Sequence, residues 1–184
     1  ERLDPPTYYW LEQHLNVPVI DHWWQTETGW SICANPAGIE LLECRAGSCG
    51  VPAPGWDLRV LDEAGQEVAT GEEGAIVVKA PLPPSAFATV WRDHERFEQS
   101  YWSQYPGFYL TGDGGYCDED GYVYVMGRTD DVINVAGHRL STGRIEEVLA
   151  EHAAVAECAV VGIRDEQKGQ VPVGLLLLKD PEQF

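Results

Sequence analysis

Short apolar runs separated by turn signals limit the fold of this chain more strongly than any other feature of its sequence. Between residues 56 and 125, strand-length runs lie at residues 58–60, 75–79, 108–110 and 122–125. Glycine, proline and aspartate separate these runs, and Asp120-Gly121 is typical of a hairpin turn. Residues 93–101 have a helical pattern instead. Many short strands with such turns predict a small antiparallel sheet or barrel.

Other patterns flank this β-rich stretch. Asp4 and the two prolines after it are typical of a helix start, which predicts a helix over residues 8–16. Residues 17–20 predict a buried strand that ends in Trp23 and Trp24.

The pattern after Asp130 becomes strand, helix, strand, strand. The expected strands are residues 132–135, 155–163 and 171–178, and Ser141 with Thr142 can cap a helix over residues 143–153. We therefore predict a fold of mixed α/β and β-rich character. Residues 1–129 would form the first domain, and residues 130–184 would begin a separate α+β unit.

The charge of the chain excludes several kinds of partner. Its 12 basic and 30 acidic residues give a net charge of −18, which repels nucleic-acid phosphates and favours solubility. The longest apolar run, residues 171–178, is strand length and cannot span a membrane as a helix. We therefore expect neither a nucleic-acid nor a membrane partner.

The cysteines predict a reducing compartment. Five of them are scattered along the chain without a Cys-x-x-Cys pair, which argues against a zinc site or a disulfide framework. We expect a cytoplasmic protein, or one of the mitochondrial matrix if the source is eukaryotic.

Residues 23–30, WWQTETGW, place polar side chains at the end of the predicted buried strand. Ligands of open α/β sheets bind at that end, and hydroxyls with a carboxylate can meet phosphate oxygens and Mg²⁺. A tryptophan-rich core strand followed by a polar turn explains the segment equally well.

Three further polar segments have simpler explanations when each is taken alone. Asp113, after Thr111-Gly112, can bond ribose hydroxyls or be part of an ordinary turn. Residues 127–131 read most simply as a salt-bridged turn between domains. Arg139 can form a fork to phosphates, although a surface arginine is the usual explanation.

Together, these segments resemble successive core motifs of the adenylate-forming superfamily. WWQTETGW at residues 23–30, YLTGD at 109–113, GRTDDVINVAGHRLSTGRIEE at 127–147 and CAVVGIRDEQKGQVPV at 158–173 follow in the order of that family. The wording is most similar to short-chain acyl-CoA synthetases of the acetyl and propionyl type. The resemblance implies the end of a large N-terminal domain, with a strand and a distorted antiparallel β-barrel, followed by the start of a small, mobile C-terminal domain.

The activity that the resemblance implies has two steps. A short carboxylate, propionate or acetate, attacks the α-phosphorus of ATP with Mg²⁺, and CoA then displaces AMP from the acyl-adenylate. An adenylation domain that loads a carrier protein and a non-catalytic nucleotide-binding relative are the alternatives.

The resemblance also implies residue roles. The ATP wall would contain Glu1, Arg2, Asp21, His22, Trp23, Trp24, Gln25 and Thr26. Thr26 would bond a phosphate, Glu27 would hold Mg²⁺, and Asp113 and Arg128 would contact the ribose or phosphates. Trp24 would close the acyl pocket, Asp130 would be the hinge, and Arg139 would reach the phosphates. Ala136 and Gly137 would line the CoA path, and the main chain at Ala150, His152 and Val155 would form a structural-ion loop.

The sequence departs from the family pattern in four respects. Arg2 replaces a proline, and His152-Ala153 replaces His-Pro. The phosphate loop and the adenylating lysine of the family would lie before Glu1 and after Phe184. Because that lysine stabilises the transition state, we expect the segment alone to be inactive as a catalyst.

Overall fold

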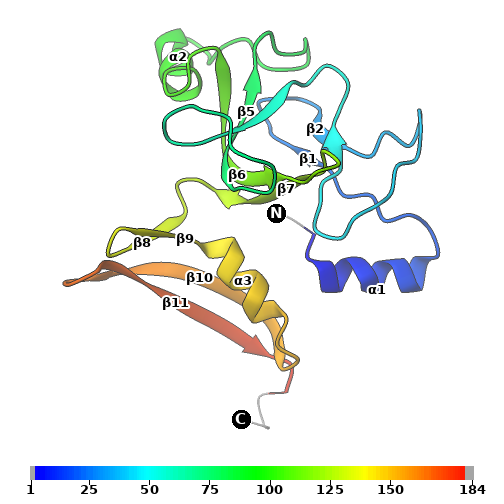
Figure 1. Ribbon diagram of the computed structural model, residues 1–184, viewed down its shortest axis with the longest axis vertical. Coiled ribbons are helices and arrows are strands. Elements are labelled where there is room, and N and C mark those ends of the chain that lie inside the picture. Colours follow the sequence, from blue (N-terminus) through cyan, green and yellow to red (C-terminus); the bar gives the residue numbers. More distant parts are fainter. Residues whose placement is uncertain (1–2, 181–184) are drawn as a thin grey trace. The chain divides into compact units, whose positions relative to one another are not determined.

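The computed structural model describes residues 3–180. The chain divides into two compact units, whose bounds are Glu1–Val125 and Met126–Phe184. The division falls inside strand β7 (Val123–Arg128), shortly before the boundary expected at Asp130. Figure 1 labels the elements of both units. Glu1 and Arg2 lie outside the described residues.

The first unit begins with helix α1 (Pro5–Leu15), as predicted. Its N-cap is Asp4, whose Oδ1 accepts a hydrogen bond of 3.0 Å from the Thr7 amide. Tyr8 is the buried residue of this helix, and its hydroxyl donates to the Cys44 carbonyl.

The buried strand predicted over residues 17–20 is wrong. Strand β1 contains only Trp23–Trp24, and the side chain of Val17 is 56% exposed. The sheet order is β1-β2-β3, in which β1 pairs antiparallel with β2 (Ser31–Ala34), and β2 pairs with β3 (Val51–Pro52). No described strand pairs with residues 17–20, so their backbone lacks the ladder that a strand requires.

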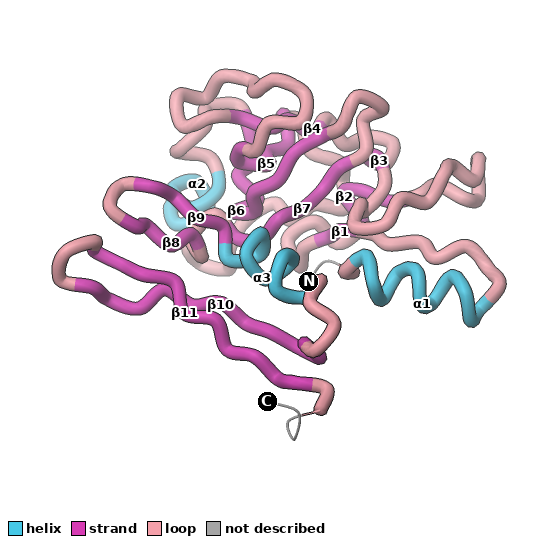
Figure 2. Tube along the Cα trace, turned by 60° about the horizontal axis from the view of Figure 1, so that its bottom comes forward, coloured by secondary structure: helices cyan, strands magenta, loops and turns pink. Residues whose placement is uncertain are grey.

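The β-rich stretch forms a four-stranded antiparallel sheet, as the turn pattern predicts. Its order is β4 (Leu58–Leu61), β5 (Gly74–Lys79), β6 (Phe108–Cys117) and β7. Figure 2 shows these strands side by side. Helix α2 (His94–Tyr101), which was predicted over residues 93–101, is inserted between β5 and β6, and Asp93 caps it. Both sheets of this unit are open in the described part of the chain, so the strands do not close a barrel there.

Strand β6 is longer than the sequence pattern predicts, because the glycines at 112, 114 and 115 do not end it. Its register against β5 advances from Leu110 to Gly114 while β5 moves only from Val77 to Ala75, which marks a bulge. Gly112 has a φ of +76° inside this bulge, a conformation that glycine adopts at no steric cost. The bulge changes the direction of the strand next to Asp113.

The core of the first unit lies on these strands. Ile76, Val77 and Val78 of β5 are completely buried, and Tyr109 of β6 is 1% exposed. Trp23 packs against the same cluster. The core therefore fixes β1 and β6, the two strands that carry the predicted site residues.

The second unit has a four-stranded sheet of order β10-β11-β8-β9. Its strands are β8 (Val132–Val135), β9 (His138–Ser141), β10 (Val155–Asp165) and β11 (Gly169–Leu178). Strand β9 was not predicted. Helix α3 (Thr142–Ala150) is capped by Ser141, as predicted, but ends before the expected residue 153. It lies against the β10–β11 hairpin (Figure 1).

A two-residue turn joins β8 to β9. Val135 pairs with His138, and both intervening residues have positive φ, +52° at Ala136 and +89° at Gly137. Positive φ at both positions is the geometry of a type I′ hairpin turn. Among residues 3–180 no helix has the length and apolar character needed to cross a membrane.

Candidate functional site

Gln25 is the centre of the polar site in the first unit. Its Nε2 donates to Asp113 Oδ2 and to the Thr111 carbonyl, each at 2.7 Å. Its Oε1 accepts from the Tyr109 hydroxyl at 2.9 Å. The turn after β1 and the bulged part of β6 are therefore joined although they lie 86 residues apart in the sequence.

Alternation along β6 brings three polar side chains to one face. Tyr109, Thr111 and Asp113 are each separated by two residues, and they are 1%, 4% and 8% exposed. Thr111 Oγ1 donates to the Ile76 carbonyl and accepts from the Asp113 amide. These bonds hold the backbone at Asp113, and Gln25 supplies the donor that its buried carboxylate requires, because an unpaired buried charge is costly.

The turn after β1 is held by Thr28, which is 1% exposed. Its hydroxyl accepts a hydrogen bond from the backbone amide of Gln25 and lies within 3 Å of the backbone carbonyls of Gln25 and Trp30. Thr28 is thus occupied within the turn, whereas Thr26 is exposed. The structure therefore leaves Thr26 at the surface, where the phosphate contact was expected.

Glu27 is half-buried and is oriented by two contacts. Its Oε1 accepts from the Tyr101 hydroxyl at 3.2 Å, and its carbonyl accepts from the Phe87 amide at 2.7 Å. A single protein carboxylate with substrate phosphates and water is a usual ligand set for Mg²⁺. The donor chemistry of Glu27 thus fits the ion that was predicted for it.

The remaining predicted residues of the ATP wall lie before this turn. Asp21 accepts from the backbone amides of Leu3 and His22, so the backbone at Leu3 lies against the Asp21 carboxylate. His22 and Trp24 are exposed, Trp24 by 53%. Glu1 and Arg2, which were predicted for the same wall, lie outside the described residues.

The predicted residues of the second unit are mostly exposed. Arg128 Nε donates to Asp130 Oδ1 at 3.0 Å, and this hydrogen bond lowers the pKa of Asp130. Ala136 and Gly137 form the exposed tip of the β8–β9 turn. Arg139 lies in β9, but its side chain is outside the described part of the structure.

The loop after α3 contains the main-chain positions expected to hold a structural ion. Ala150 ends the helix, and the His152 carbonyl accepts from the Val155 amide at 2.9 Å. Part of the acceptor capacity of this loop is therefore used by its own turn. The ion site stays a prediction.

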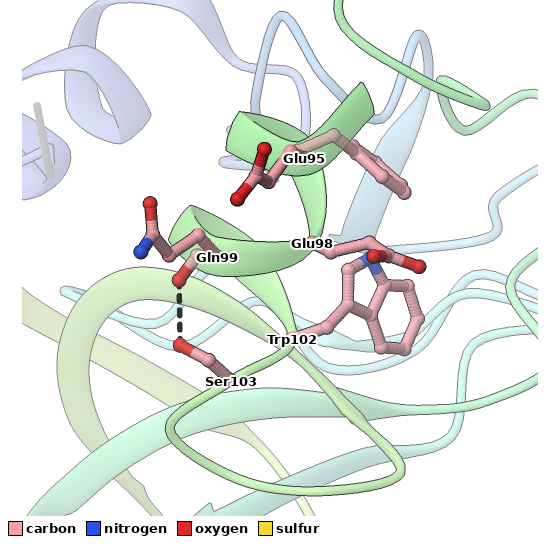
Figure 3. A pocket seen from close by; sticks show the side chains of 6 residues that line it. Glu95, Glu98, Gln99, Trp102 and Ser103 are labelled. Carbon is pink, nitrogen blue, oxygen red and sulfur yellow. Dashed lines mark hydrogen bonds between the residues drawn. The ribbon is translucent and has the colours of Figure 1, made fainter. Parts of the chain in front are cut away.

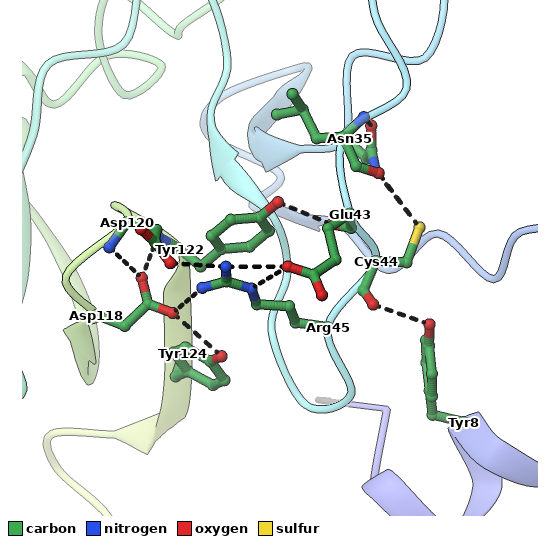
Figure 4. Close-up of polar contacts among 10 residues, drawn as sticks. Tyr8, Asn35, Glu43, Cys44, Arg45, Asp118, Asp120, Tyr122 and Tyr124 are labelled. Carbon is green, nitrogen blue, oxygen red and sulfur yellow. Dashed lines mark hydrogen bonds and ion pairs between the residues drawn. The ribbon is translucent and has the colours of Figure 1, made fainter.

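Arg45 forms a separate ionic cluster outside the predicted site (Figure 4). Its guanidinium donates to Asp118 and Asp120 at 2.7 Å and lies 3.9 Å from the centre of the Tyr122 ring. Partial burial alone would raise the pKa of Asp118, but hydrogen bonds from the Tyr122 amide and Arg45 outweigh it and lower that pKa. The cluster fastens the loop before β3 to the β6–β7 turn.

A surface groove of about 550 Å³ runs along α2. Figure 3 shows its lining, which includes Glu95, Glu98 and Trp102. None of the residues predicted for the site lines this groove. We therefore assign the candidate site to the polar cluster around Gln25 and not to the groove.

The sequence predicted Asp113, Gln25 and Glu27 for the site, but not Tyr101 and Tyr109, which the structure places in contact with them. Tyr109 belongs to the YLTGD motif and shares its face with Asp113. A period-two reading of residues 108–115 as one strand would have placed it there. Tyr101 carries no such signal, because its contact with Glu27 crosses 74 residues.

Comparison with known proteins matches two parts of the chain to models of one enzyme family. The family model of the AMP-binding enzymes matches residues 1–87, and that of the AMP-binding enzyme C-terminal domain matches residues 144–183. Mouse mitochondrial acyl-CoA synthetase short-chain family member 3 is 49% identical over 97% of this chain and 26% of its own length. Propionate–CoA ligase of Escherichia coli K12 is 48% identical over 100% of this chain and 30% of its own length.

A solved structure shows the same similarity in three dimensions. The anthranilate CoA ligase AuaEII, in complex with anthranoyl-AMP, has a TM-score of 0.81 and 32% identity. The match covers 100% of this chain and 34% of that one. The chain thus spans about a third or less of the proteins that it matches. The chain belongs to the adenylate-forming family of AMP-binding enzymes, and it is similar there to the acetyl- and propionyl-type short-chain acyl-CoA synthetases.

Proposed function

We propose that the full-length protein is an AMP-forming acyl-CoA synthetase that activates propionate or acetate. In the first step a carboxylate oxygen forms a bond to the α-phosphorus of ATP, and the bond from that phosphorus to pyrophosphate breaks. In the second step the CoA thiolate attacks the acyl carbon and AMP leaves. The similarity to a propionate–CoA ligase and to a ligase solved with an acyl-adenylate supports this reaction.

The observation that carries the proposal is the bond between Gln25 and Asp113. Because Nε2 of Gln25 holds one carboxylate oxygen at 2.7 Å, the Asp113 carboxylate has a fixed direction. A fixed acidic acceptor is suited to the paired hydroxyls of a ribose, as in dinucleotide sites. We propose that Asp113 binds the ribose of ATP and that Gln25 and the residues before it form the surrounding wall.

Glu27 is the residue that we propose for the Mg²⁺ that accompanies ATP. The ion supplies neutralisation of phosphate charge when it is bound. The chain's own contribution is a carboxylate directed by the Tyr101 hydroxyl, on a backbone held by the hydrogen bond from the Phe87 amide. Thr26, which is exposed beside it, is proposed to donate to a phosphate oxygen.

Residues of the second unit are proposed to act at successive stages of the two half-reactions. Asp130 is proposed as the hinge between the half-reactions, with Arg128 as a ribose or phosphate contact. Arg139 is proposed to reach the phosphates during adenylation, and Ala136 with Gly137 to border the CoA path. Exposure of the Arg128–Asp130 pair supports a contact that can exchange partners, since exposed ion pairs are weak.

Trp24 is proposed to limit the length of the acyl chain. An indole occupies the volume of several methylenes, and steric overlap in a closely packed wall outweighs the gain from burying a longer chain.

The name of the mouse relative places that protein in mitochondria. A cytoplasmic or matrix location for this protein is part of the proposal.

Propionate-dependent exchange of pyrophosphate into ATP tests the proposal in the purified full-length protein. We expect exchange with propionate and acetate, and a thioester when CoA is added. Absence of exchange with every acid from acetate to butyrate would refute the proposal. Transfer of the acyl group to a carrier protein, but not to CoA, would assign the protein to the other class of adenylating enzyme.

A further inference from the structure

Two stacked tyrosines lie beneath the turn that carries Gln25 and Glu27. The rings of Tyr101, at the end of α2, and Tyr109, in β6, are 5.6 Å apart at an angle of 15°. Phe87 packs its ring edge-on against both, at 5.0 Å and 6.1 Å. Because Tyr109 is only 1% exposed, the hydrophobic core holds this stack in place.

The hydroxyls of the stack reach two different residues of the same turn. Tyr101 donates to the Glu27 carboxylate at 3.2 Å, and Tyr109 donates to Gln25 Oε1 at 2.9 Å. The other end of the Gln25 amide donates to Asp113. One aromatic pair is thereby connected to both acidic groups of the candidate ATP site.

We propose that the Tyr101–Tyr109 stack is a positioning device for MgATP. In this role Tyr101 orients Glu27 for the metal ion, and Tyr109 orients Asp113 through Gln25. The inference rests on the proposed function of the site and adds two positioning residues to it. Neither tyrosine is assigned a contact with the reacting atoms.

The chemistry of the amide explains why Tyr109 matters. A glutamine side chain has an acceptor oxygen and a donor NH₂ group at its end, and rotation by half a turn exchanges them. The Tyr109 hydroxyl donates to the oxygen, which leaves the NH₂ group directed at Asp113. Without this hydroxyl, the Gln25 side chain would be held only at its NH₂ end, by Asp113 and the Thr111 carbonyl, and the Asp113 carboxylate would be less firmly directed.

The argument for Tyr101 concerns the metal ion. Mg²⁺ requires near-ideal octahedral geometry, so a carboxylate that is already oriented binds it with less ordering. Tyr101 is the hydroxyl that holds Oε1 of Glu27. Removal of the Tyr101 hydroxyl should therefore first raise the Mg²⁺ concentration that half-saturates the enzyme.

A second tyrosine stack, between β6 and the neighbouring strand β7, offers a matched control. Tyr116 and Tyr124 are also stacked, at 4.7 Å and 6°, and the Tyr124 hydroxyl donates to a carboxylate, that of Asp118. Asp118 belongs to the Arg45 cluster and not to the candidate site. Tyr124→Phe thus removes a comparable hydroxyl from a comparable stack.

The experiment compares Tyr101→Phe, Tyr109→Phe and Tyr124→Phe in the full-length protein. Propionate-dependent pyrophosphate exchange is measured against Mg²⁺ and ATP concentration, together with the melting temperature. We expect Tyr101→Phe to raise the half-saturating Mg²⁺ concentration about fivefold, with activity recovered at high Mg²⁺. We expect Tyr109→Phe to raise KM for ATP about fivefold, and Tyr124→Phe to leave both constants unchanged.

A second variant tests the route through Gln25. In a Gln25→Met background, Tyr109→Phe should raise KM for ATP no further, because the amide through which it acts is gone. An additional increase in that background would overturn the relay. Constants equal to those of Tyr124→Phe, or a lower melting temperature with unchanged constants, would overturn the positioning role and leave only packing.

Failure of the proposed function would have a different signature. If the wild-type protein shows no exchange with any short acid, the proposed activity is refuted. Calorimetric titration with MgATP then decides the inference on the same variants. Weaker MgATP binding in Tyr101→Phe and Tyr109→Phe, but not in Tyr124→Phe, would support it, and equal affinities would overturn it.

Discussion

The polar residues of the two units are held in opposite ways. In the first unit, Asp113 is 8% exposed and accepts from Gln25, which is itself held by Tyr109. In the second unit, the Arg128–Asp130 pair has side chains that are 48% and 71% exposed.

A buried network has one arrangement, because each lost partner leaves an unsatisfied polar group. An exposed ion pair is weak and can change partners at little cost. The first unit is therefore suited to hold a ligand, and the second to change its contacts.

The largest effect should come from Asp113→Ala in the full-length protein. Loss of charge-assisted hydrogen bonds to the ribose should raise KM for ATP roughly 100-fold. Asp120→Ala is the matched control, because it removes an exposed carboxylate of the Arg45 cluster. An unchanged KM for ATP in Asp113→Ala would exclude this residue from the site and contradict the ligand-holding role of the first unit.

Asp130→Pro should affect the two half-reactions unequally. Proline fixes φ, so a backbone that must rotate between two states is trapped in one of them. We expect a roughly tenfold larger loss in one half-reaction than in the other, measured as pyrophosphate exchange and as thioester formation. Asp130→Ala, which removes the Arg128 bond but not the rotation, should have little effect. Equal losses in both half-reactions would contradict the hinge.

Trp24→Gly should change the choice of acid more than the binding of ATP. Removal of the indole should move the optimum to acids several carbons longer, since each buried methylene contributes about 0.8 kcal/mol. KM for ATP should stay within about threefold, because Asp113 and Gln25 are untouched. Trp91→Ala, which removes a tryptophan that is 83% exposed, is the control. A wild-type preference for octanoate, or an unchanged optimum in the variant, would identify Trp24 as a packing residue.

Local rules predicted the parts of the fold that depend on neighbouring residues. Asp4 and Ser141 cap their helices as expected, because a cap involves residues only three positions away. The strand at residues 17–20 failed because strand formation needs a partner that the local pattern does not reveal.

The site shows the same limit. The motif around Asp113 identified the carboxylate, but the glycines of β6 concealed the strand that places Tyr109 and Thr111 beside it. The side-chain hydrogen bonds that join Gln25 and Glu27 to α2 and β6 cross 74 to 88 residues, so only the folded chain forms them. Individual residue types were thus predictable, whereas their partners were not.

The smallest effect concerns the acid stability of the Arg45 cluster. Its carboxylate Asp118 has a pKa below the ordinary value of 3.8, because amide and guanidinium donors outweigh partial burial. A depressed pKa stabilises the fold at pH values above the unfolded pKa, and this contribution is lost as pH falls through the folded pKa. Asp118→Asn should therefore lower the melting temperature of the full-length protein by roughly 2 °C at pH 7, since the pair is partly exposed. The difference from wild type should shrink as pH falls below about 4.

Asp120→Asn, whose carboxylate is 65% exposed, should give a smaller shift in melting temperature at about pH 7. A difference that stays constant down to about pH 3 would show that Asp118 stabilises the loop through its shape and not through its charge.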